Sequence, residues 1–325
     1  MNESDLPRPP TAQAPRGLQQ LADQAFKRAT GAQLVSGNRV RILKDAAENF
    51  PAWLDAIRAA ERTVYFESYI IGDDPVGREF VDALAERARA GVRVRMLYDW
   101  LGTRPRRALF APLIEAGGAV RVFNPPRIGS PVGWLTRDHR KSIAVDGRVG
   151  FVSGLCPSAR WLGNPARRID AWRDTGVEIR GPAVAEVERA FGQAWAACGA
   201  SAIDEAEYTP LESMAPVGDV AVRVIASVPD SGGLFRLDQL IAAAASGRLW
   251  LTDAYFVGLT PYVRALCSAA EDDVDVRLLV PGASDIPVVS RMSRAGYRPL
   301  LESGVRVFEW NGSMLHAKSA VADNR

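Results

Sequence analysis

The 325-residue sequence has few cysteines and no cysteine pattern that is typical of a metal site or a disulfide framework. Cys156, Cys198 and Cys267 are odd in number, and their spacing matches no zinc motif. We interpret them as reduced thiols that pack as small apolar residues in a reducing compartment.

Long apolar runs are also missing. No segment reaches the roughly 20 residues needed to span a bilayer, and residues 1–16 are polar and proline-rich, without the apolar centre of a signal peptide. The sequence therefore predicts a soluble, cytoplasmic protein. Its net charge of +2 lacks the strong basic bias of nucleic-acid-binding proteins, so we expect no nucleic acid partner.

Lysine and histidine are scarce, and their few positions coincide. Of 40 basic residues only four are lysine, and the chain has two histidines, His139 and His316. Lys141 and Lys318 each stand two residues after one of these histidines. The same spacing at both histidines, in a chain that otherwise uses arginine, indicates a chemical requirement rather than coincidence.

Both pairs begin a segment of the form His-x-Lys-x-x-x-x-Asp, which ends at Asp146 in the first copy and at Asp323 in the second. Residues two apart on a strand point to one face, so each His and Lys is expected to face a common cleft. The two aspartates precede Gly147 and Asn324, and a simple turn role for them remains open.

This set of side chains suits phosphodiester chemistry. One imidazole can attack phosphorus and form a phosphohistidine. A second, protonated imidazole can give its proton to the leaving alkoxide and later take one from the incoming hydroxyl. Lysine ammonium groups can stabilise the charge on the phosphate oxygens. Two histidines cannot supply a usual metal cage, so we expect no metal and no cofactor.

The segments end two copies of one structural plan. The first copy predicts strands at 39–43, 63–71, 92–98 and 119–123 and helices at 50–61, 76–90 and 107–116. The second predicts strands at 249–256, 274–280 and 305–308 and helices at 234–246, 261–270 and 291–303. Glu67 and Asp253 align as carboxylates on matching strands.

We therefore predict an α/β fold of two pseudo-symmetric lobes, each a mostly parallel or mixed sheet flanked by helices, with the active site at the lobe interface. The expected boundaries are a flexible lead-in at 1–38, a first domain at 39–199, a linker at 200–218 and a second, incomplete domain at 219–325.

The paired motifs resemble those of the phospholipase D superfamily, and the surrounding sequence is similar to its bacterial cardiolipin synthase branch. The stretches that carry this likeness are 67–70, 90–95, 138–141, 172–175, 181–184 and 254–256. The resemblance implies that His139 is the nucleophile and His316 the general acid and base, with an exchange of roles left open. It implies that Lys141 and Lys318 hold the phosphate oxygens.

The resemblance also assigns supporting residues. Asp146 and Asp323 would support the site from behind, and Asp174 would hydrogen-bond the first histidine and fix its tautomer. A surface pair between Asp174 and Arg173 is the alternative. Glu67 and Asp253 are candidates for a position near the site.

Two departures from the family pattern stand out. Cys156 occupies the position of a family asparagine, and Ser153 is expected to replace part of its contact with the substrate phosphate. The segment that follows the first motif, at about 147–197, has no second copy after Asp323. We expect from this that the chain is truncated, lacks an acidic partner for His316, and is impaired or unstable in this form.

The implied function is phosphatidyl transfer on membrane glycerophospholipids, with cardiolipin made from phosphatidylglycerol and glycerol released. The alternatives are a hydrolase that acts on phospholipid or nucleic acid, and an impaired binding protein. The expected partner is an anionic membrane surface, at the inner face of the cell membrane. The loop residues Arg127, Ile128, Trp134, Leu135 and Arg137 suit this contact, although an ordinary surface loop fits them as well.

Overall fold

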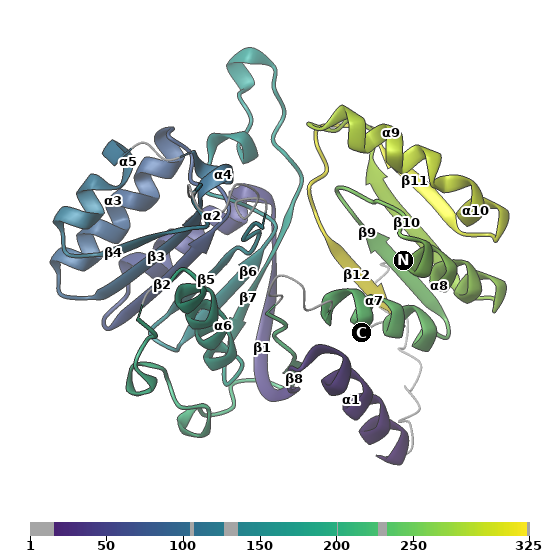
Figure 1. Cartoon of the computed structure of the whole chain (residues 1–325), viewed down its shortest axis with the longest axis horizontal. Coiled ribbons are helices and arrows are strands. Elements are labelled where there is room, and N and C mark those ends of the chain that lie inside the picture. The colour runs from purple at the N-terminus through teal and green to yellow at the C-terminus, as the bar shows by residue number, and fades with distance from the viewer. Residues whose placement is uncertain (1–15, 105–106, 127–135, 200, 227–232, 324–325) are drawn as a thin grey trace, which may run out of the picture.

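Two β-sheets, one in each half of the chain, form the framework of the protein (Figure 1). The computed structural model describes residues 16–104, 107–126, 136–199, 201–226 and 233–323. The strands are β1 (Val35–Lys44), β2 (Thr63–Ser68), β3 (Arg93–Asp99), β4 (Ala119–Phe123), β5 (Ser142–Val145), β6 (Val149–Ser153), β7 (Thr175–Arg180), β8 (Val220–Val222), β9 (Arg248–Thr252), β10 (Asp275–Pro281), β11 (Arg306–Trp310) and β12 (Ser319–Ala322). The helices are α1 (Arg16–Thr30), α2 (Asp45–Arg58), α3 (Pro75–Arg89), α4 (Trp100–Thr103), α5 (Arg107–Glu115), α6 (Val184–Ala197), α7 (Gly233–Ala244), α8 (Thr260–Glu271), α9 (Pro287–Ala295) and α10 (Tyr297–Glu302).

Both sheets mix parallel and antiparallel strands. Within the described residues the first has the order β4-β3-β2-β5-β6-β7-β1-β8, and the second has the order β11-β10-β9-β12. In each lobe the central strands are parallel, and the strand that follows the motif lysine runs antiparallel beside them. The predicted α/β fold of two lobes with mixed sheets and flanking helices is confirmed.

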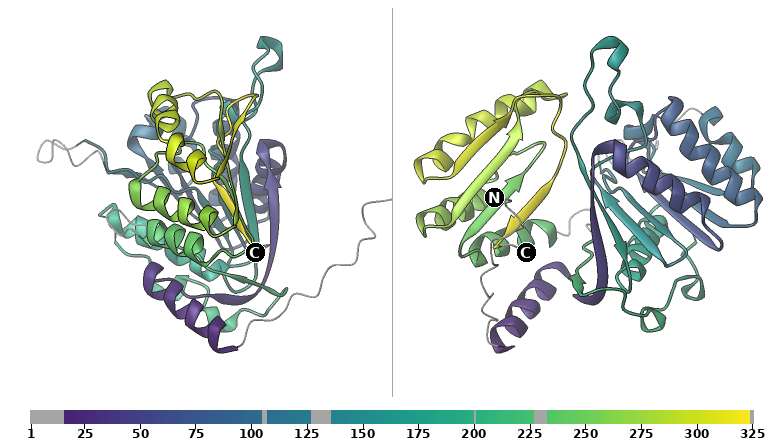
Figure 2. Two further views of the ribbon diagram at one scale, coloured as in Figure 1. Left: turned by 90° about the vertical axis from the view of Figure 1, so that its right-hand side faces the viewer. Right: turned by 180° about the vertical axis from the view of Figure 1, so that it is seen from behind.

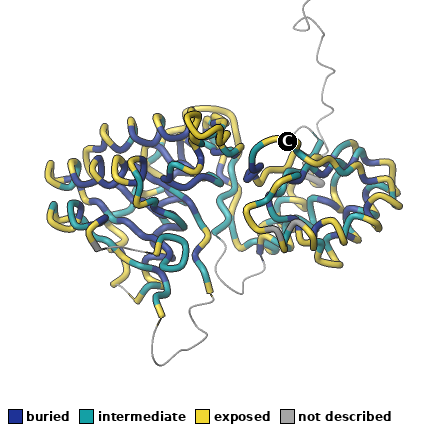
Figure 3. The backbone as a smooth tube through the Cα atoms, turned by 90° about the horizontal axis from the view of Figure 1, so that it is seen from above, coloured by how far each residue is buried: buried dark blue, intermediate teal, exposed yellow. Residues whose placement is uncertain are grey.

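The first sheet is covered on both faces because its strand residues alternate between two cores. Val64 and Phe66 pack with α2, α3 and α5, whereas Tyr65 between them packs with α6. Figure 1 shows α6 in front of the sheet, and the reverse view in Figure 2 shows α2 and α3 on the other side. β2, which lies inside this sheet, is therefore buried along its whole length, and Figure 3 shows buried segments in dark blue within this lobe.

The second sheet has one main core, in which Leu249 and Leu278 pack against Leu266 of α8 and Leu300 of α10. On the other face of this sheet, Trp250 lies opposite Val321 of the neighbouring strand, and it is 36% exposed. In the described part of the chain, no helix is both long enough and apolar enough to cross a membrane.

Strand register corrects one predicted equivalence between the lobes. Ser142 lies opposite Glu67, and Ser319 lies opposite Thr252. Because each serine directly follows a motif lysine, the counterpart of Glu67 is Thr252, and the predicted match with Asp253 is wrong by one residue. The second copy has one additional residue between the strand and the tyrosine that follows it, which the alignment of letters did not reveal.

The expected flexible lead-in at 1–38 is wrong for the described residues 16–38. They form α1 and the start of β1, and α1 packs against α7 of the second lobe. An ion pair between Asp23 and Arg223 also holds α1 in place. β8, expected in the second domain, pairs with β1 in the first sheet. These contacts join segments far apart in sequence, so local periodicity does not predict them.

Asp146 and Asp323 fix the ends of their lobes' strands rather than contacting the histidines. Each has a positive φ, 55° and 48° respectively, and each carboxylate accepts three backbone N–H bonds of 2.7 to 2.9 Å. The donors are Glu61, Arg62 and Thr63 for the first and Ser246, Gly247 and Arg248 for the second. Asp146 lies about 13 Å along the strand from Ser142. The prediction that Asp146 supports the site from behind is therefore corrected.

Asp146→Ala should lower the free energy of unfolding by about 2–4 kcal/mol, because it leaves backbone donors beside Thr63 without an acceptor. Asp146→Asn, which keeps one carbonyl oxygen, should lower it less. Arg148→Ala is the matched control, since it removes only an exposed ion pair with Glu61. Urea unfolding measures all three. A loss for Asp146→Ala no larger than that of the control would contradict this structural role.

Candidate active site

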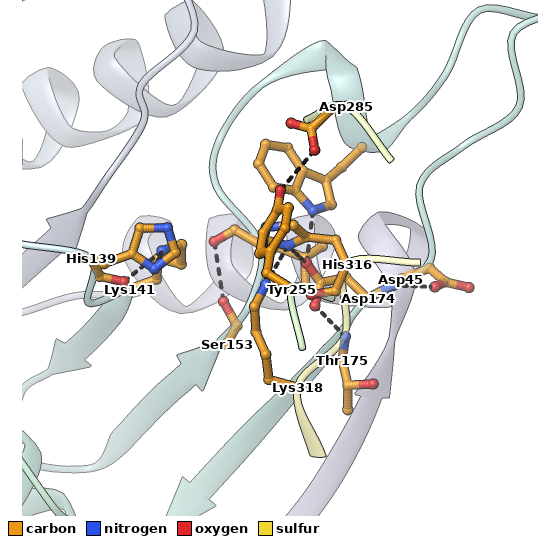
Figure 4. A network of polar contacts seen from close by, with 12 residues as sticks. Asp45, His139, Lys141, Ser153, Asp174, Thr175, Tyr255, Asp285, His316 and Lys318 are labelled. Atoms are coloured by element: carbon orange, nitrogen blue, oxygen red, sulfur yellow. Dashed lines mark hydrogen bonds and ion pairs between the residues drawn. The ribbon is translucent and has the colours of Figure 1, made fainter. Parts of the chain in front are cut away.

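The two His-Lys pairs meet in one cleft between the lobes, with a volume of about 780 Å³. His139, Lys141 and His316 line this cleft, and Lys318 lies against His316. The residues stand directly before β5 and β12, the antiparallel strands that occupy equivalent places in the two sheets. Figure 4 shows His139 and Lys141 on one side and His316 and Lys318 on the other.

Each lobe builds its pair in the same way. In the first, the ring of His139 packs on Tyr69 with 4.5 Å between ring centroids. Lys141 donates to the carbonyl of His139 at 2.5 Å, and its Nζ lies 3.2 Å from His139 Nδ1. The ammonium also lies 5.3 Å from the centre of the Tyr69 ring. The lysine is thus held beside its histidine by one backbone acceptor and one aromatic face.

The second lobe repeats this arrangement with Tyr255 in the place of Tyr69. The His316 and Tyr255 rings are 5.6 Å apart, and the Lys318 ammonium lies 5.3 Å from the Tyr255 ring. Lys318 donates to the carbonyl of His316 at 2.6 Å and lies 2.9 Å from its Nε2. The two tyrosines that support the histidines were not predicted as site residues, although both stand in stretches that carried the family resemblance.

Asp174 binds the second histidine, not the first as predicted. Its Oδ2 lies 2.7 Å from Nδ1 of His316, and the same oxygen accepts a 2.9 Å hydrogen bond from the indole of Trp161. The expected lack of an acidic partner for His316 is therefore also wrong. The alternative surface pair with Arg173 is not formed either, because Arg173 pairs with Asp45 at 3.0 Å.

Asp174 binds His316 rather than His139 because the two lobes are in direct contact. The N–H of His316 donates to the carbonyl of Arg173 at 2.7 Å, and the N–H of Arg173 donates to the carbonyl of Met314 at 2.9 Å. The two segments therefore lie side by side, and the carboxylate that follows the first motif reaches the imidazole of the second lobe.

Gly154 leaves the space that Asp174 needs. A Cβ at this position would lie 2.1 Å from Asp174 Oδ1, which no side chain can accommodate. Oδ1 itself accepts the N–H of Thr175 at 2.9 Å. The buried carboxylate is thus satisfied on both oxygens, and the glycine after Ser153 in the sequence is explained by this close approach.

The surroundings disfavour the charged form of both imidazoles. The pKa of His139 is lowered by desolvation in the cleft and by the neighbouring Lys141 and Lys318 ammonium groups. Burial also lowers the pKa of His316, while the Asp174 carboxylate acts in the opposite direction. An uncharged His139 is suited to act as a nucleophile, and a His316 held by a carboxylate is suited to carry a proton.

Desolvation likewise affects the lysines. It lowers the pKa of buried Lys141, and it lowers the pKa of Lys318 to about 8. Part of the Lys318 side chain is exposed, but its ammonium lies between His316 and Tyr255. With a pKa of about 8, Lys318 is still mostly a cation at neutral pH and can meet a phosphate anion.

Three other predicted residues lie around the pairs. Glu67 is buried beneath the first motif, where it accepts bonds from Arg140 at 2.7 Å and Ser142 at 2.8 Å. Burial and the nearby Asp138 raise the pKa of Glu67 to about 8. Asp253 accepts the N–H of Tyr255 at 2.9 Å.

The hydroxyl of Ser153 donates to the carbonyl of Leu155 at 3.3 Å, and Ser153 is not part of the cleft lining, whereas Cys156 is. Within the described residues, no group of three or more His, Cys, Asp or Glu side chains is arranged to hold a metal ion. Arg127, Ile128, Trp134 and Leu135 of the predicted membrane loop lie outside the described residues. Arg137 is described, and it pairs with buried Asp99 at 3.1 Å.

Comparison with known proteins identifies the family. Residues 53–195 and 237–325 match the family described as cardiolipin synthase, PLD-like domain, and the chain belongs to this family. It is 32% identical over 314 residues to a cardiolipin synthase of Halalkalibacterium halodurans and 32% identical over 313 residues to one of Alkalihalophilus pseudofirmus. Each alignment covers 95% of this chain, and the chain spans 62% of the length of each relative.

Solved structures show the same fold at low sequence identity. The phosphatidylserine synthase of Haemophilus influenzae superposes with a TM-score of 0.67 at 15% identity, covering 94% of this chain and 81% of that one. A polyphosphate kinase of Porphyromonas gingivalis gives 0.55 at 13% identity, covering 97% of this chain and 47% of that one.

The presence of only two histidines makes their protonation states directly measurable. ¹⁵N NMR, with each ring assigned from a single His→Gln variant, should show His316 as the Nδ1–H tautomer and both rings less protonated at pH 6.5 than a free imidazole, because their pKa values are lowered. Asp174→Asn should disturb the His316 signals and leave His139 unchanged. Asp82→Asn, the same change on the exposed side of α3, is the control. An Nε2–H tautomer of His316 in the unmodified chain would contradict the assignment.

Proposed function

We propose that this chain carries the chemistry of a phosphatidyltransferase that joins two phosphatidylglycerol molecules into cardiolipin and releases glycerol. The observation that carries the proposal is the cleft in which two His-Lys pairs face one another, with Asp174 bound to only one of the two imidazoles. Membership of the family and the likeness to cardiolipin synthases support the choice of substrate.

In the first step the uncharged imidazole of His139 attacks phosphorus, and the bond from phosphorus to the glycerol oxygen breaks. His316 gives its Nε2 proton to that oxygen, so glycerol leaves as a neutral alcohol. The bound phosphodiester anion favours the protonated form of His316, whose Nδ1–H is held by Asp174. Lys141 and Lys318 stabilise the charge on the non-bridging oxygens.

In the second step the hydroxyl of another phosphatidylglycerol gives its proton back to His316, and its oxygen attacks phosphorus. The phosphorus–nitrogen bond to His139 breaks, which restores the free imidazole. Two phosphatidylglycerols are thus converted into one cardiolipin and one glycerol, with every proton accounted for. Water in place of the second lipid would give phosphatidic acid by the same step, which is the hydrolase alternative.

The same proposal places the protein at the inner surface of the cell membrane, with anionic phospholipid as its partner. The substrate remains in the bilayer, and the site is an open cleft between lobes. The face of the molecule that carries this cleft would then meet the lipid headgroups.

Mass spectrometry of the lipids after incubation with phosphatidylglycerol vesicles tests the reaction. We expect cardiolipin and free glycerol in equal amounts, and we expect His139→Gln and His316→Gln each to lower the rate by about 10³-fold or more. Arg264→Gln, on the exposed side of α8, is the control. Phosphatidic acid as the sole product would make the protein a hydrolase, and an unaffected rate in His139→Gln would remove the nucleophile.

The rate should also fall as pH rises through about 8, because Lys318 then loses its proton and its attraction for the phosphate. The sign follows from a lowered lysine pKa: the cation is present below pH 8 and lost above it. In Lys318→Arg, whose guanidinium keeps its charge, the fall of the rate through pH 8 should be smaller, because only Lys141 of the two cations can still lose a proton. A rate of the unmodified chain that is constant over the same range would contradict the role of Lys318.

A further inference from the structure

The rim of the catalytic cleft carries charged residues that the proposed chemistry does not use. Its carboxylates already have partners within the protein. Asp73 pairs with Arg78 at 2.8 Å, and Asp285 accepts the hydroxyl of Tyr255 at 2.9 Å. Asp74 accepts the N–H of Gly77 at the start of α3. These acids are therefore parts of the wall rather than free ligands for a cation.

The two arginines of the cleft differ from these acids. Arg104 and Arg160 line the cleft, and both are exposed. Within the described residues, neither guanidinium forms an ion pair or a hydrogen bond to the protein. The guanidinium groups of Arg104 and Arg160 are therefore cations without an ion-pair partner among the described residues, and both line the space where substrate must bind.

Arg160 stands on a turn that is anchored at both ends. It is the middle residue of the short helix η2 (Ala159–Trp161), whose N-terminal side is bound to Asp74 through Ser158 Oγ and the N–H of Ala159, each at 2.9 Å. The indole of Trp161 binds the Asp174 oxygen that also holds His316. The backbone of Arg160 is therefore fixed relative to the general acid.

Arg104 occupies a backbone conformation that disfavours its side chain. It ends α4 with φ +47°, a left-handed position where glycine or asparagine is usual. The hydroxyl of the preceding Thr103 donates to the carbonyl of Tyr69 at 3.2 Å, and Tyr69 packs on His139. The backbone of Arg104 is thereby tied to the residue that packs on the nucleophile, while its side chain lines the cleft.

The cleft thus has two tiers of cations, with lysines beside the histidines and arginines at the rim. We propose that Arg104 and Arg160 form a second phosphate subsite, which holds the phosphodiester of the acceptor phospholipid. This rests on the proposed function, because an acceptor phosphatidylglycerol carries its own phosphate one glycerol unit away from the attacking hydroxyl. The planar guanidinium fork is suited to a phosphodiester, and a water or simple alcohol acceptor has no use for it.

Competition between two acceptors tests the subsite. Vesicles of phosphatidylglycerol with added 1-butanol should give both cardiolipin and phosphatidylbutanol, which share the donor and the catalytic residues. Arg104→Gln and Arg160→Gln should each lower the ratio of cardiolipin to phosphatidylbutanol by about tenfold, since each removes a charged hydrogen bond. Arg264→Gln is again the matched control and should leave the ratio unchanged. An unchanged ratio in both rim variants, or an equal fall of both products, would overturn the subsite.

Binding of sn-glycerol 3-phosphate, measured by calorimetry on the whole chain without lipid, separates this proposal from the reaction. We expect two equivalents on the unmodified chain and one on the Arg104→Gln/Arg160→Gln chain, while Lys141→Gln keeps the rim site. If the unmodified chain binds two equivalents, the rim variant binds one, and neither makes cardiolipin, that result would contradict the proposed reaction and still support the anion site. If the Arg104→Gln/Arg160→Gln chain still binds two equivalents, the subsite is contradicted, whether or not the proposed reaction takes place.

Discussion

The bond between Asp174 and His316 is the contact on which the site depends. Both side chains are buried, they come from different lobes, and only 2.7 Å separates the carboxylate oxygen from Nδ1. A buried carboxylate is stable only when its oxygens are hydrogen-bonded, and here Trp161 and Thr175 complete the set. The backbone bonds that align residues 173 and 316 bring the two groups together. One carboxylate therefore holds the lobe interface, the ring orientation of His316 and its proton.

The duplicated plan explains both the symmetry of the site and its departure from symmetry. Each lobe supplies a tyrosine, a histidine and a lysine in the same arrangement, because β5 and β12 enter their sheets at the same place. Asp174 is different, since a single carboxylate binds only one of the two imidazoles. His316 is thereby held with a defined proton, whereas His139 is open to the cleft beside Lys141. Equivalent residues thus lie in unequal surroundings, which suits the unequal roles that we propose for them in a two-step displacement.

Much of this arrangement follows from the sequence, because the features that predict it are local. Alternation of apolar residues predicted the strands, and the repeated His-x-Lys spacing indicated one shared cleft. The partner of Asp174 could not be predicted in the same way, because it depends on how two segments about 140 residues apart lie together. The equivalence of Glu67 and Asp253 failed for a related reason, since one additional residue after β9 shifts the strand register without changing the pattern of letters. Asp146 was assigned by its motif, whereas its three backbone donors show what that position does in the fold.

The central claim is that His139 carries the covalent intermediate while His316 moves the proton. The most direct measurement is rapid mixing of the unmodified chain with phosphatidylglycerol vesicles, a quench in alkaline denaturant, which preserves a phosphorus–nitrogen bond, and peptide mapping by mass spectrometry. The two histidine-containing peptides are distinct in sequence, so the site of any adduct is unambiguous. A phosphatidyl group on the peptide with His139 is the predicted result. The same group on the peptide with His316 would contradict the account.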